Sequence, residues 1–290
     1  MARVAASATP DLSPSACLMD RYAVIGNPVA HSKSPQIHQA FARATGQAMT
    51  YERLLAPLDA FVPTVEAFAQ GGGRGLNVTV PFKLQAFALA EAVSARAEAA
   101  GACNTLKRTE TGWYADNTDG AGIMHDLTVN LHVPLAGRDV LVLGAGGAAR
   151  GILVPLFAQS PRSVTIANRT VAKGRELAML FAARGPIAAC APDELATKSF
   201  DVVINATSAG LRDDVALPWP AGIFRADAFA YDMIYGDAPT AFLRFAQRHG
   251  VRRFADGLGM LVEQAAESFL LWRGVRPETA PVFALLRPPR

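Results

Sequence analysis

The chain has 290 residues, of which 51% are hydrophobic and 18% are charged. This composition provides enough apolar surface for a packed interior and excludes a disordered chain, and the length favours two domains over one. The net charge of +3 comes from scattered basic residues. It excludes a nucleic-acid footprint but is compatible with a small anionic ligand.

Three cysteines, Cys17, Cys103 and Cys190, lie far apart in the sequence, without a C-x-x-C pair or clustered histidines. This spacing predicts neither a disulfide framework nor a metal site, and it indicates a reducing, cytoplasmic setting. Residues 1–20 are rich in Ala, Ser and Pro and lack the apolar core of a signal peptide, so we expect a disordered tail there. Because no apolar run approaches the roughly 18 residues that span a bilayer, no membrane role is expected.

Short β-rich runs alternate with helical patterns from residue 22 onward. Strands are expected over 22–25, 50–54 and 76–80, with helices starting at about Pro35 and after Pro57. This alternation predicts β-α-β units and a mainly parallel sheet, which is an α/β fold. At the first helix, Ser34 is expected to accept a hydrogen bond from a free backbone N–H.

A second α/β series begins near residue 139. Strands are expected over 140–143, 164–167 and 202–204, with helices after Gly147 and Thr170. This is the pattern of a Rossmann-type, doubly wound sheet.

The end of the chain is expected to be helical, over 257–272 and again after Pro277. We expect these helices to return to the first domain. The prediction is therefore a first domain of residues 21–119 and 257–290, and a second domain of residues 120–256.

A glycine-rich run follows the strand at 139–143 and opens a helix: Gly144, Ala145, Gly146, Gly147, Ala148 and Ala149. It matches the G-x-G-x-x-G/A fingerprint of dinucleotide sites. Gly144 permits the tight turn, Gly146 lets the backbone approach a pyrophosphate, and Ala149 allows close packing of helix on strand. In this strand–turn–helix context, the run predicts that the second domain binds a nicotinamide dinucleotide.

The next strand ends at Ala167 and leads into Asn168, Arg169 and Thr170. An NAD site normally has Asp or Glu here, and that carboxylate would repel a 2′-phosphate. Arg169 can instead face the phosphate or stack on adenine, so NADP is the expected cofactor. The alternative is a solvated arginine in a loop whose neighbours cap the next helix. Thr207, after a later strand, either lines the nicotinamide ribose or belongs to an ordinary turn.

Four polar runs each follow or end a predicted strand. They read HSKSP at 31–35, NVTVPFK at 77–83, GACNT at 101–105 and DNTDG at 116–120. Because the ends of strands in an open α/β sheet converge on one crevice, these runs bring hydroxyls, amides, a lysine and a carboxylate together. The sequence therefore predicts a pocket for a small polyhydroxylated molecule.

These runs, followed by YDMIY at 231–235 and DGLGM at 256–260, resemble the shikimate dehydrogenase family. The resemblance extends from about residue 22 to the C-terminal helices. It implies a substrate-binding domain beside an NADP-binding domain, and the NADPH-dependent reduction of 3-dehydroshikimate to shikimate in the biosynthesis of chorismate and aromatic amino acids. The oligomeric state stays open between a monomer and a homodimer.

The resemblance implies roles for single residues around the substrate. Lys83 and Asp119 match the family's catalytic pair. Ser32 and Ser34 match residues that bind the substrate carboxylate, and Tyr235 would border that end. The residues expected to read the ring hydroxyls are Asn77, Thr79, Asn104 and Gln264. Taken singly, each of these polar residues is equally well explained as a buried group that satisfies the backbone.

The resemblance also implies a set of cofactor contacts: Gly144, Ala145, Gly146, Gly147, Ala148, Asn168, Arg169, Thr170, Lys173, Met233 and Gly257. One departure is visible, because many relatives have an acidic residue near the cofactor where this chain has Ala95. This departure puts only that single contact in doubt.

The chemistry of ketone reduction agrees with these assignments. Hydride transfer builds negative charge on oxygen, so the site needs a proton donor at that atom. Lys83 as an ammonium can supply the proton, and Asp119 can fix its direction. The alternative for this pair is a plain salt bridge that joins two segments.

Three other functions are compatible with parts of the sequence. The nearest is an NAD-dependent quinate/shikimate dehydrogenase, which Arg169 argues against. A non-catalytic sensor would not need both Lys83 and Asp119. A methylene-tetrahydrofolate dehydrogenase-like enzyme shares the broad architecture but leaves the runs at 31–35 and 77–83 unexplained.

Overall fold

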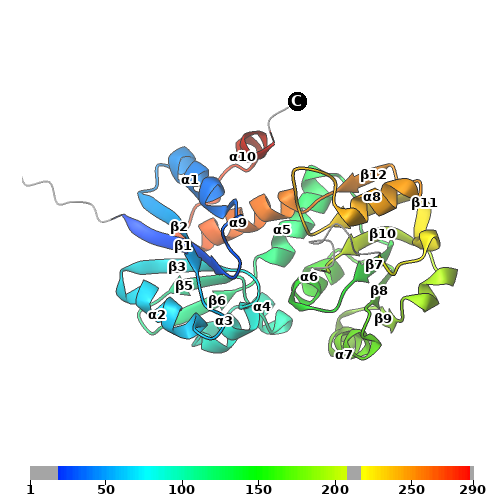
Figure 1. Cartoon of the computed structure of the whole chain (residues 1–290), viewed down its shortest axis with the longest axis horizontal. Coiled ribbons are helices and arrows are strands. Elements are labelled where there is room, and N and C mark those ends of the chain that lie inside the picture. The colour runs from blue at the N-terminus through cyan, green and yellow to red at the C-terminus, as the bar shows by residue number, and fades with distance from the viewer. Residues whose placement is uncertain (1–18, 208–216, 288–290) are drawn as a thin grey trace, which may run out of the picture.

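The computed structural model describes residues 19–207 and 217–287. The tail expected over residues 1–20 falls almost entirely outside this part of the chain. Two six-stranded sheets lie side by side, each flanked by helices (Figure 1). The predicted α/β fold with two sheet domains is therefore confirmed.

The first sheet has the strand order β2-β1-β3-β5-β6-β4. Strand β1 runs parallel to both β2 and β3, whereas β5 is antiparallel to its two neighbours. The strands are β1 (Asp20–Gly26), β2 (Met49–Leu55), β3 (Gly73–Val78), β4 (Ala92–Val93), β5 (Thr105–Arg108) and β6 (Trp113–Asp116). The helices are α1 (Ser34–Thr45), α2 (Phe61–Gln70), α3 (Lys83–Leu89) and α4 (Ala95–Ala100).

Two local predictions for this domain need correction. Ser34 does not cap α1, because Lys33 is the N-cap residue and makes no side-chain cap bond. Instead, the Ser32 hydroxyl accepts a hydrogen bond from the backbone N–H of Ser34 at 3.3 Å. The strand predicted over 76–80 ends at Val78, since the backbone turns there and the N–H of Phe82 donates to the carbonyl of Thr79.

The second sheet is parallel throughout, with the order β12-β11-β10-β7-β8-β9. Numbered within this sheet, the order is that of a Rossmann fold, which confirms the doubly wound prediction. The strands are β7 (Asp139–Leu143), β8 (Ser163–Ala167), β9 (Ile187–Cys190), β10 (Phe200–Asn205), β11 (Phe224–Asp232) and β12 (Arg253–Ala255). The helices on this sheet are α6 (Gly147–Phe157), α7 (Val171–Phe181) and α8 (Ala241–Arg248).

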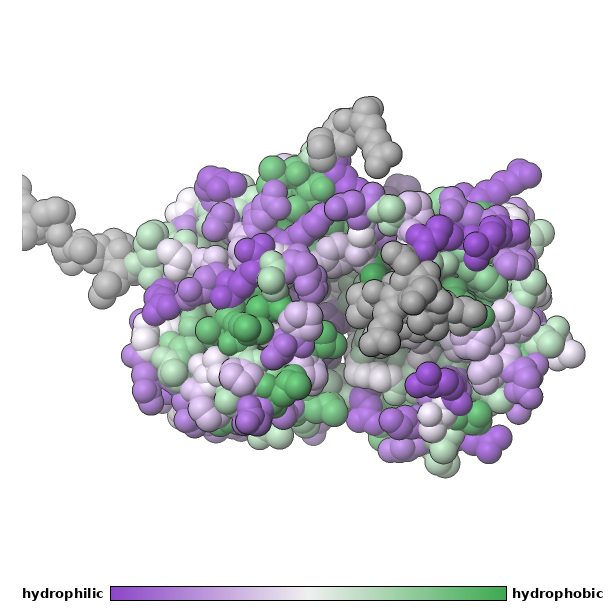
Figure 2. Space-filling view, in the orientation of Figure 1, coloured by the Kyte–Doolittle hydropathy of each residue, from purple (hydrophilic) through white to green (hydrophobic). Residues whose placement is uncertain are grey.

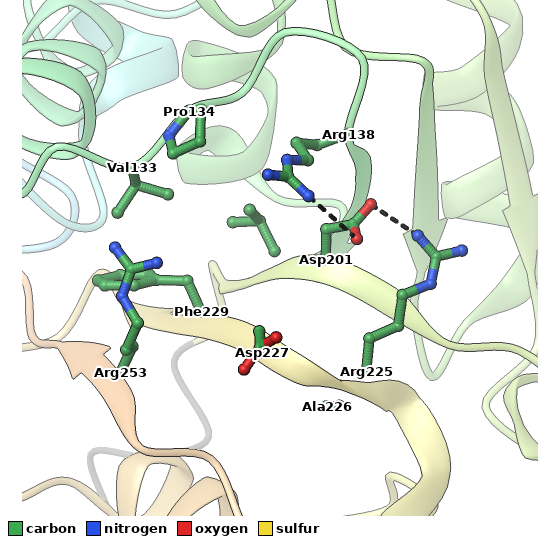
Figure 3. A pocket seen from close by; sticks show the side chains of 10 residues that line it. Val133, Pro134, Arg138, Asp201, Arg225, Ala226, Asp227, Phe229 and Arg253 are labelled. Carbon is green, nitrogen blue, oxygen red and sulfur yellow. Dashed lines mark hydrogen bonds and ion pairs between the residues drawn. The ribbon is translucent and has the colours of Figure 1, made fainter.

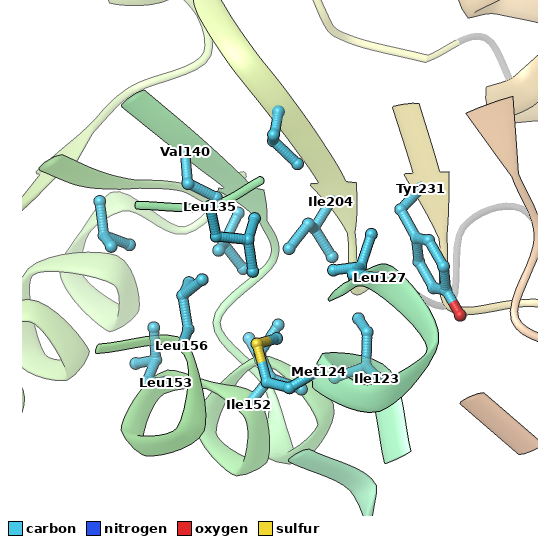
Figure 4. Packing of buried hydrophobic residues seen from close by; sticks show 14 of the residues in the cluster. Ile123, Met124, Leu127, Leu135, Val140, Ile152, Leu153, Leu156, Ile204 and Tyr231 are labelled. Carbon is cyan, nitrogen blue, oxygen red and sulfur yellow. The ribbon is translucent and has the colours of Figure 1, made fainter. Parts of the chain in front are cut away.

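One core of the second domain lies between the sheet and two helices (Figure 4). Val140 and Ile204, from β7 and β10, pack against Ile152 and Leu156 of α6, and all four side chains are fully buried. Helix α5 (Asp119–His125) adds Ile123 to the same cluster. Burying each such side chain contributes about 1.5–3 kcal/mol, which holds α6 and its N-terminus in place against the sheet.

The C-terminal helices α9 (Leu258–Arg273) and α10 (Ala280–Leu286) pack on the first sheet. Phe269 of α9 lies in one buried cluster with Tyr22 of β1 and Phe41 of α1. Helix α9 also crosses α5 so closely that a Cβ on Gly122 would lie 2.7 Å from the backbone nitrogen of Gln264. These helices thus contact the first domain as expected, while the exact domain boundaries stay a prediction.

Over residues 19–207 and 217–287, no helix is both long and apolar enough to cross a membrane.

Candidate active site

Lys83 and Asp119 are the first residues of α3 and α5, and their side chains form an ion pair through Lys83 Nζ and Asp119 Oδ2. The carboxylate is nearly buried, since the side chain is 7% exposed, whereas that of Lys83 is 20% exposed. Asp119 Oδ1 accepts a second hydrogen bond, from Asn104 Nδ2 at 2.8 Å. Both carboxylate oxygens are therefore held by protein, and the ammonium keeps protons for another acceptor.

A cluster of amides and hydroxyls surrounds the ion pair. Asn104 Nδ2 also lies 2.9 Å from Thr118 Oγ1 and 3.2 Å from Gln264 Oε1. The Gln264 amide nitrogen donates to the carbonyl of Leu261, which fixes the direction of that side chain. The structure thus brings Asn104 and Gln264, two of the four residues expected to read ring hydroxyls, to the ion pair.

The other two residues of that set, Thr79 and Asn77, differ in how many bonds they make. No hydrogen bond involves the Thr79 hydroxyl among the residues that the structure describes, and the side chain is half-buried, so this group is free for a ligand. The Asn77 side chain is almost fully buried and is bonded at both ends: Oδ1 accepts from Tyr51 at 2.7 Å, and Nδ2 donates to Ser268 at 2.9 Å.

Ser32, in the loop before α1, lies next to Ser34, the first residue of α1, with 3.1 Å between their hydroxyl oxygens. Arg53 fixes this loop by donating two hydrogen bonds, of 2.9 and 2.6 Å, to the carbonyl of Ser32. The Lys33 ammonium lies 5.9 Å from the centre of the Tyr235 ring, and burial raises the pKa of the Tyr235 phenol, so this hydroxyl stays protonated. The three residues expected at the substrate carboxylate are therefore adjacent. Two cationic side chains, Arg53 and Lys33, flank them.

The glycine-rich turn joins the ends of three neighbouring strands. The N–H of Gly144 bonds the carbonyl of Ala167 at the end of β8, and the N–H of Ala206 bonds the carbonyl of Leu143, each at 2.8 Å. Gly144 has φ +107°, a conformation that requires glycine.

The same turn has the open space that a pyrophosphate needs. A Cβ added to Gly146 or Gly147 would meet no atom within 4 Å. Gly146 is the N-cap residue of α6, and no side chain caps this helix end. Free backbone N–H groups at an open helix N-terminus are the ordinary partners of a phosphate, so these residues fit a dinucleotide.

The residues expected around the rest of the cofactor follow β8, β10, β11 and β12, at the carboxyl ends of the same sheet. Arg169, Thr170 and Lys173 are exposed beyond β8, and the Asn168 amide donates to the carbonyl of Thr170 at 2.8 Å. The Thr207 hydroxyl donates to Asn205 at 2.7 Å. Met233 and Gly257 touch, since a Cβ on Gly257 would lie 2.2 Å from the carbonyl oxygen of Met233.

The start of α6 faces the first domain across a close contact. A Cβ on Gly120 would lie 2.5 Å from the carbonyl oxygen of Gly151, and one on Gly151 would lie 3.1 Å from Asn117 Nδ2. The helix that the glycine turn opens is therefore a neighbour of the segment that ends in Asp119. Figure 2 shows a hollow between the two lobes of the molecule.

A separate cavity of about 330 Å³ lies at the opposite ends of the second sheet's strands (Figure 3). Asp201, at the start of β10, pairs there with Arg138 and Arg225. Because ligands of such sheets bind at the carboxyl ends of the strands, this cavity is not part of the candidate site.

From the sequence, no individual role was assigned to several buried residues beneath the site: His38, Tyr51, Thr105 and Ser268. For His38 a signal was present, since it follows Ser34 by four residues on α1 and therefore shares its face. The other three come from segments that meet only in the folded chain.

Comparison with known proteins decides the family. The family models that match are the shikimate dehydrogenase substrate binding domain over residues 24–106, shikimate / quinate 5-dehydrogenase over 126–212, and the shikimate 5′-dehydrogenase C-terminal domain over 257–287. The chain belongs to the shikimate dehydrogenase family. The resemblance drawn from the six sequence runs is thereby confirmed.

Relatives match nearly the whole length. Shikimate dehydrogenase (NADP(+)) of Nitrosospira multiformis is 57% identical over 270 residues, which is 93% of this chain and 98% of the relative. Among solved structures, an Ael1 enzyme from Pseudomonas putida has a TM-score of 0.85 at 46% identity, covering 93% and 99% of the two chains. Shikimate 5-dehydrogenase from Thermus thermophilus, in complex with NADP(H) and shikimate, has a TM-score of 0.81 at 35% identity, covering 90% and 96%.

Proposed function

We propose that this protein reduces 3-dehydroshikimate to shikimate with NADPH, as a shikimate dehydrogenase in the route to chorismate and aromatic amino acids. The observation that carries the proposal is the ion pair of Lys83 and Asp119, supported by Asn104 and adjacent to the start of α6. The names of the relatives at 57–58% identity support the same activity and cofactor.

Lys83 and Asp119 are the catalytic residues in this proposal. Bound NADPH supplies the hydride for the ketone carbon. Lys83, as an ammonium, gives a proton to the ketone oxygen as negative charge builds there. Asp119 holds the ammonium in one direction, and Asn104 holds Asp119 in turn, so the donor is already aligned when the substrate arrives.

The substrate would bind between two groups of polar residues. Ser32, Ser34 and Tyr235 would bind its carboxylate through hydroxyl groups. At the other end, the ring hydroxyls would meet Thr79, Asn104 and Gln264, of which Asn104 and Gln264 adjoin the ion pair. Asn77, whose polar atoms are already bonded within the protein, would support this group.

The cofactor would lie along the carboxyl ends of the second sheet. The turn from Gly144 to Ala148 would bind the pyrophosphate at the N-terminus of α6, and Met233, Thr207 and Gly257 would border the nicotinamide end. The 2′-phosphate would be bound by Asn168, Arg169, Thr170 and Lys173. The absence of an acidic residue directly after β8 supports NADP over NAD.

The test is an absorbance assay at 340 nm with purified protein, run in four combinations of shikimate or quinate with NADP or NAD. We expect rapid NADP reduction with shikimate and at least tenfold lower kcat/KM for the other three. Equal or faster turnover with quinate and NAD would instead support the NAD-dependent quinate/shikimate dehydrogenase. Ligand binding without any absorbance change would support the non-catalytic sensor.

We further propose a cytoplasmic location and a homodimer. The two cysteines in the described part of the chain, Cys103 and Cys190, are free and buried, which supports a reducing compartment. Light scattering would separate a dimer from the 30.7 kDa monomer.

A further inference from the structure

His38 is a buried titratable residue that the proposed chemistry does not use. It lies on α1, is fully buried, and stacks on Tyr51 with 4.2 Å between the ring centroids and 7° between the planes. Its Nε2 lies 3.1 Å from Asn77 Oδ1, and its Nδ1 has no hydrogen-bond partner in the described part of the chain. A polar side chain with a single partner in a closed core calls for a reason.

The reason lies in the direction of the bonds at Asn77. Its side-chain nitrogen faces the carbonyl oxygen of Asn104 at 3.4 Å, and a carbonyl can only accept. Asn77 Oδ1 therefore faces the other way and can only accept as well. Tyr51 and His38, which both point at this oxygen, must donate to it, so His38 carries its proton on Nε2.

Tyr51 is the second donor to Asn77 Oδ1, at 2.7 Å, and its ring stacks on that of His38. The two aromatic side chains therefore hold the Asn77 oxygen together, and they fix the direction of the amide from one side.

The opposite side of Asn77 leads to the ion pair. Asn77 Nδ2 donates to the hydroxyl of Thr105 at 3.2 Å, and Thr105 donates to Asn104 Oδ1 at 3.1 Å. Because Asn104 Oδ1 is thereby an acceptor, its amide nitrogen faces Asp119. One connected path of hydrogen bonds, all with the same polarity, therefore runs from Tyr51 and His38 to the carboxylate of the catalytic pair.

We propose that His38 and Tyr51 are positioning residues that orient the Asn77 amide, and through it the hydrogen-bond network that reaches Asn104 and Asp119 beside the substrate site. The inference rests on the proposed function, since it concerns how that site holds its substrate. Asn77 then acts through its neighbours, because every polar atom of its side chain already has a protein partner.

Two pairs of variants test this role. Tyr51→Phe removes the hydroxyl and keeps the ring stacked on His38. Its matched control is Tyr22→Phe, which removes a buried hydroxyl on the same sheet that bonds Arg273 and not Asn77. His38→Phe removes the donor and keeps an aromatic ring, whereas His38→Gln supplies a new N–H near the position of Nε2.

The measurements are kcat and KM for shikimate and for NADP, with thermal unfolding as a check on folding. Tyr51→Phe and His38→Phe should each raise KM for shikimate about 5- to 30-fold, which is the range for losing one buried hydrogen bond. KM for NADP should stay within about twofold. His38→Gln should recover much of the loss, and Tyr22→Phe should leave both KM values unchanged. A purely structural role would lower the active fraction without this split.

The inference is overturned if Tyr51→Phe folds and keeps the parent's KM for shikimate, or if it raises both KM values alike. Should His38→Phe fail to fold, Tyr51→Phe with its control decides alone. Histidine ¹⁵N NMR of the parent gives a second decision, because a proton on Nδ1 of His38 would contradict the required bond direction. A parent that does not turn over shikimate would defeat the proposed function instead, so the two failures are distinguishable.

Discussion

Lys83 and Asp119 each open a helix a few residues after a strand, and the two strands, β3 and β6, run in the same direction on either side of β5. Their carboxyl ends therefore meet at one edge of the sheet, and the two side chains form an ion pair across 36 residues of sequence. Each residue thus reaches the pair by the same local order: a strand ends, a short turn follows, and the polar residue is the first of the next helix.

Replacing the lysine should abolish most of the turnover. For Lys83→Ala we expect kcat to fall by about 10²- to 10⁴-fold, the usual share of a general acid, with the Kd for NADPH little changed. Lys107→Ala is the matched control, since Lys107 lies on the same sheet and its ammonium donates to the carbonyl of Leu271 at 2.9 Å, away from the ion pair. Stopped-flow kinetics gives kcat, and NADPH fluorescence titration gives Kd. A Lys83→Ala variant with the parent's kcat would show that Lys83 is not the proton donor.

Removing the negative charge of Asp119 should also lower kcat, for a different reason. In Asp119→Asn the side chain keeps its size, but an amide N–H must face either Lys83 or the Asn104 amide, both of which are donors. The donor then loses its fixed direction, and we expect kcat to fall about 10- to 10³-fold. The exposed Asp59→Asn serves as control in the same assay. Parental kcat in Asp119→Asn would reduce the pair to a structural salt bridge.

Much of the fold was predictable because its signals are local. Each β-rich run in the second domain became a strand, since apolar β-branched residues such as Val140 and Val164 are buried on both faces of a parallel sheet. The glycine fingerprint was readable for the same reason, because Gly144 needs a positive φ that the turn imposes locally.

The buried network was not predictable, because its members meet only through tertiary packing. Ser268 lies 191 residues from Asn77, its hydrogen-bond partner, and no spacing rule connects them. The prediction that Ser34 caps α1 was wrong for a related reason. Its hydroxyl accepts from Ser32 and its backbone N–H donates to the Ser32 hydroxyl, and the N-cap residue is Lys33.

Arg169 should decide between the two nicotinamide cofactors. For Arg169→Ala we expect KM for NADP to rise about 10- to 100-fold, as a charge-assisted hydrogen bond to the 2′-phosphate is lost, with KM for NAD unchanged. Arg175→Ala is the control, because Arg175 is exposed on α7, the helix that follows. Equal changes of KM for NADP and for NAD in Arg169→Ala would contradict the assignment of Arg169 to the 2′-phosphate, whether KM rises or falls.

Acid should destabilise the first domain through His38. Burial lowers the pKa of His38 to about 3, while its hydrogen bond to Asn77 acts weakly in the other direction. The unfolded chain has a histidine pKa of about 6.5, so between these values the unfolded state binds more protons and stability falls as pH falls.

Asp232 opposes this trend. Burial raises its pKa to about 6, against the hydrogen bonds from Thr240, Ile234 and Asn205. Between about pH 4 and pH 6 the folded chain therefore binds more protons at Asp232 than the unfolded chain does. The stabilisation that the protonated Asp232 gives at low pH is lost as pH rises through 6. The two residues partly cancel in the parent, so the effect of His38 is visible only in a comparison of variants.

His38→Phe should accordingly unmask the contribution of Asp232. Relative to the parent, the free energy of unfolding of this variant should improve by about 1.4 kcal/mol for each pH unit between 6 and 4, since one differential proton is removed. Urea unfolding at pH 4, 5, 6 and 7 measures this slope, with the exposed His31→Phe as control. Parallel curves for parent and His38→Phe would mean that His38 takes up its proton as readily in the folded chain as in the unfolded chain, which would contradict the lowering of its pKa by burial.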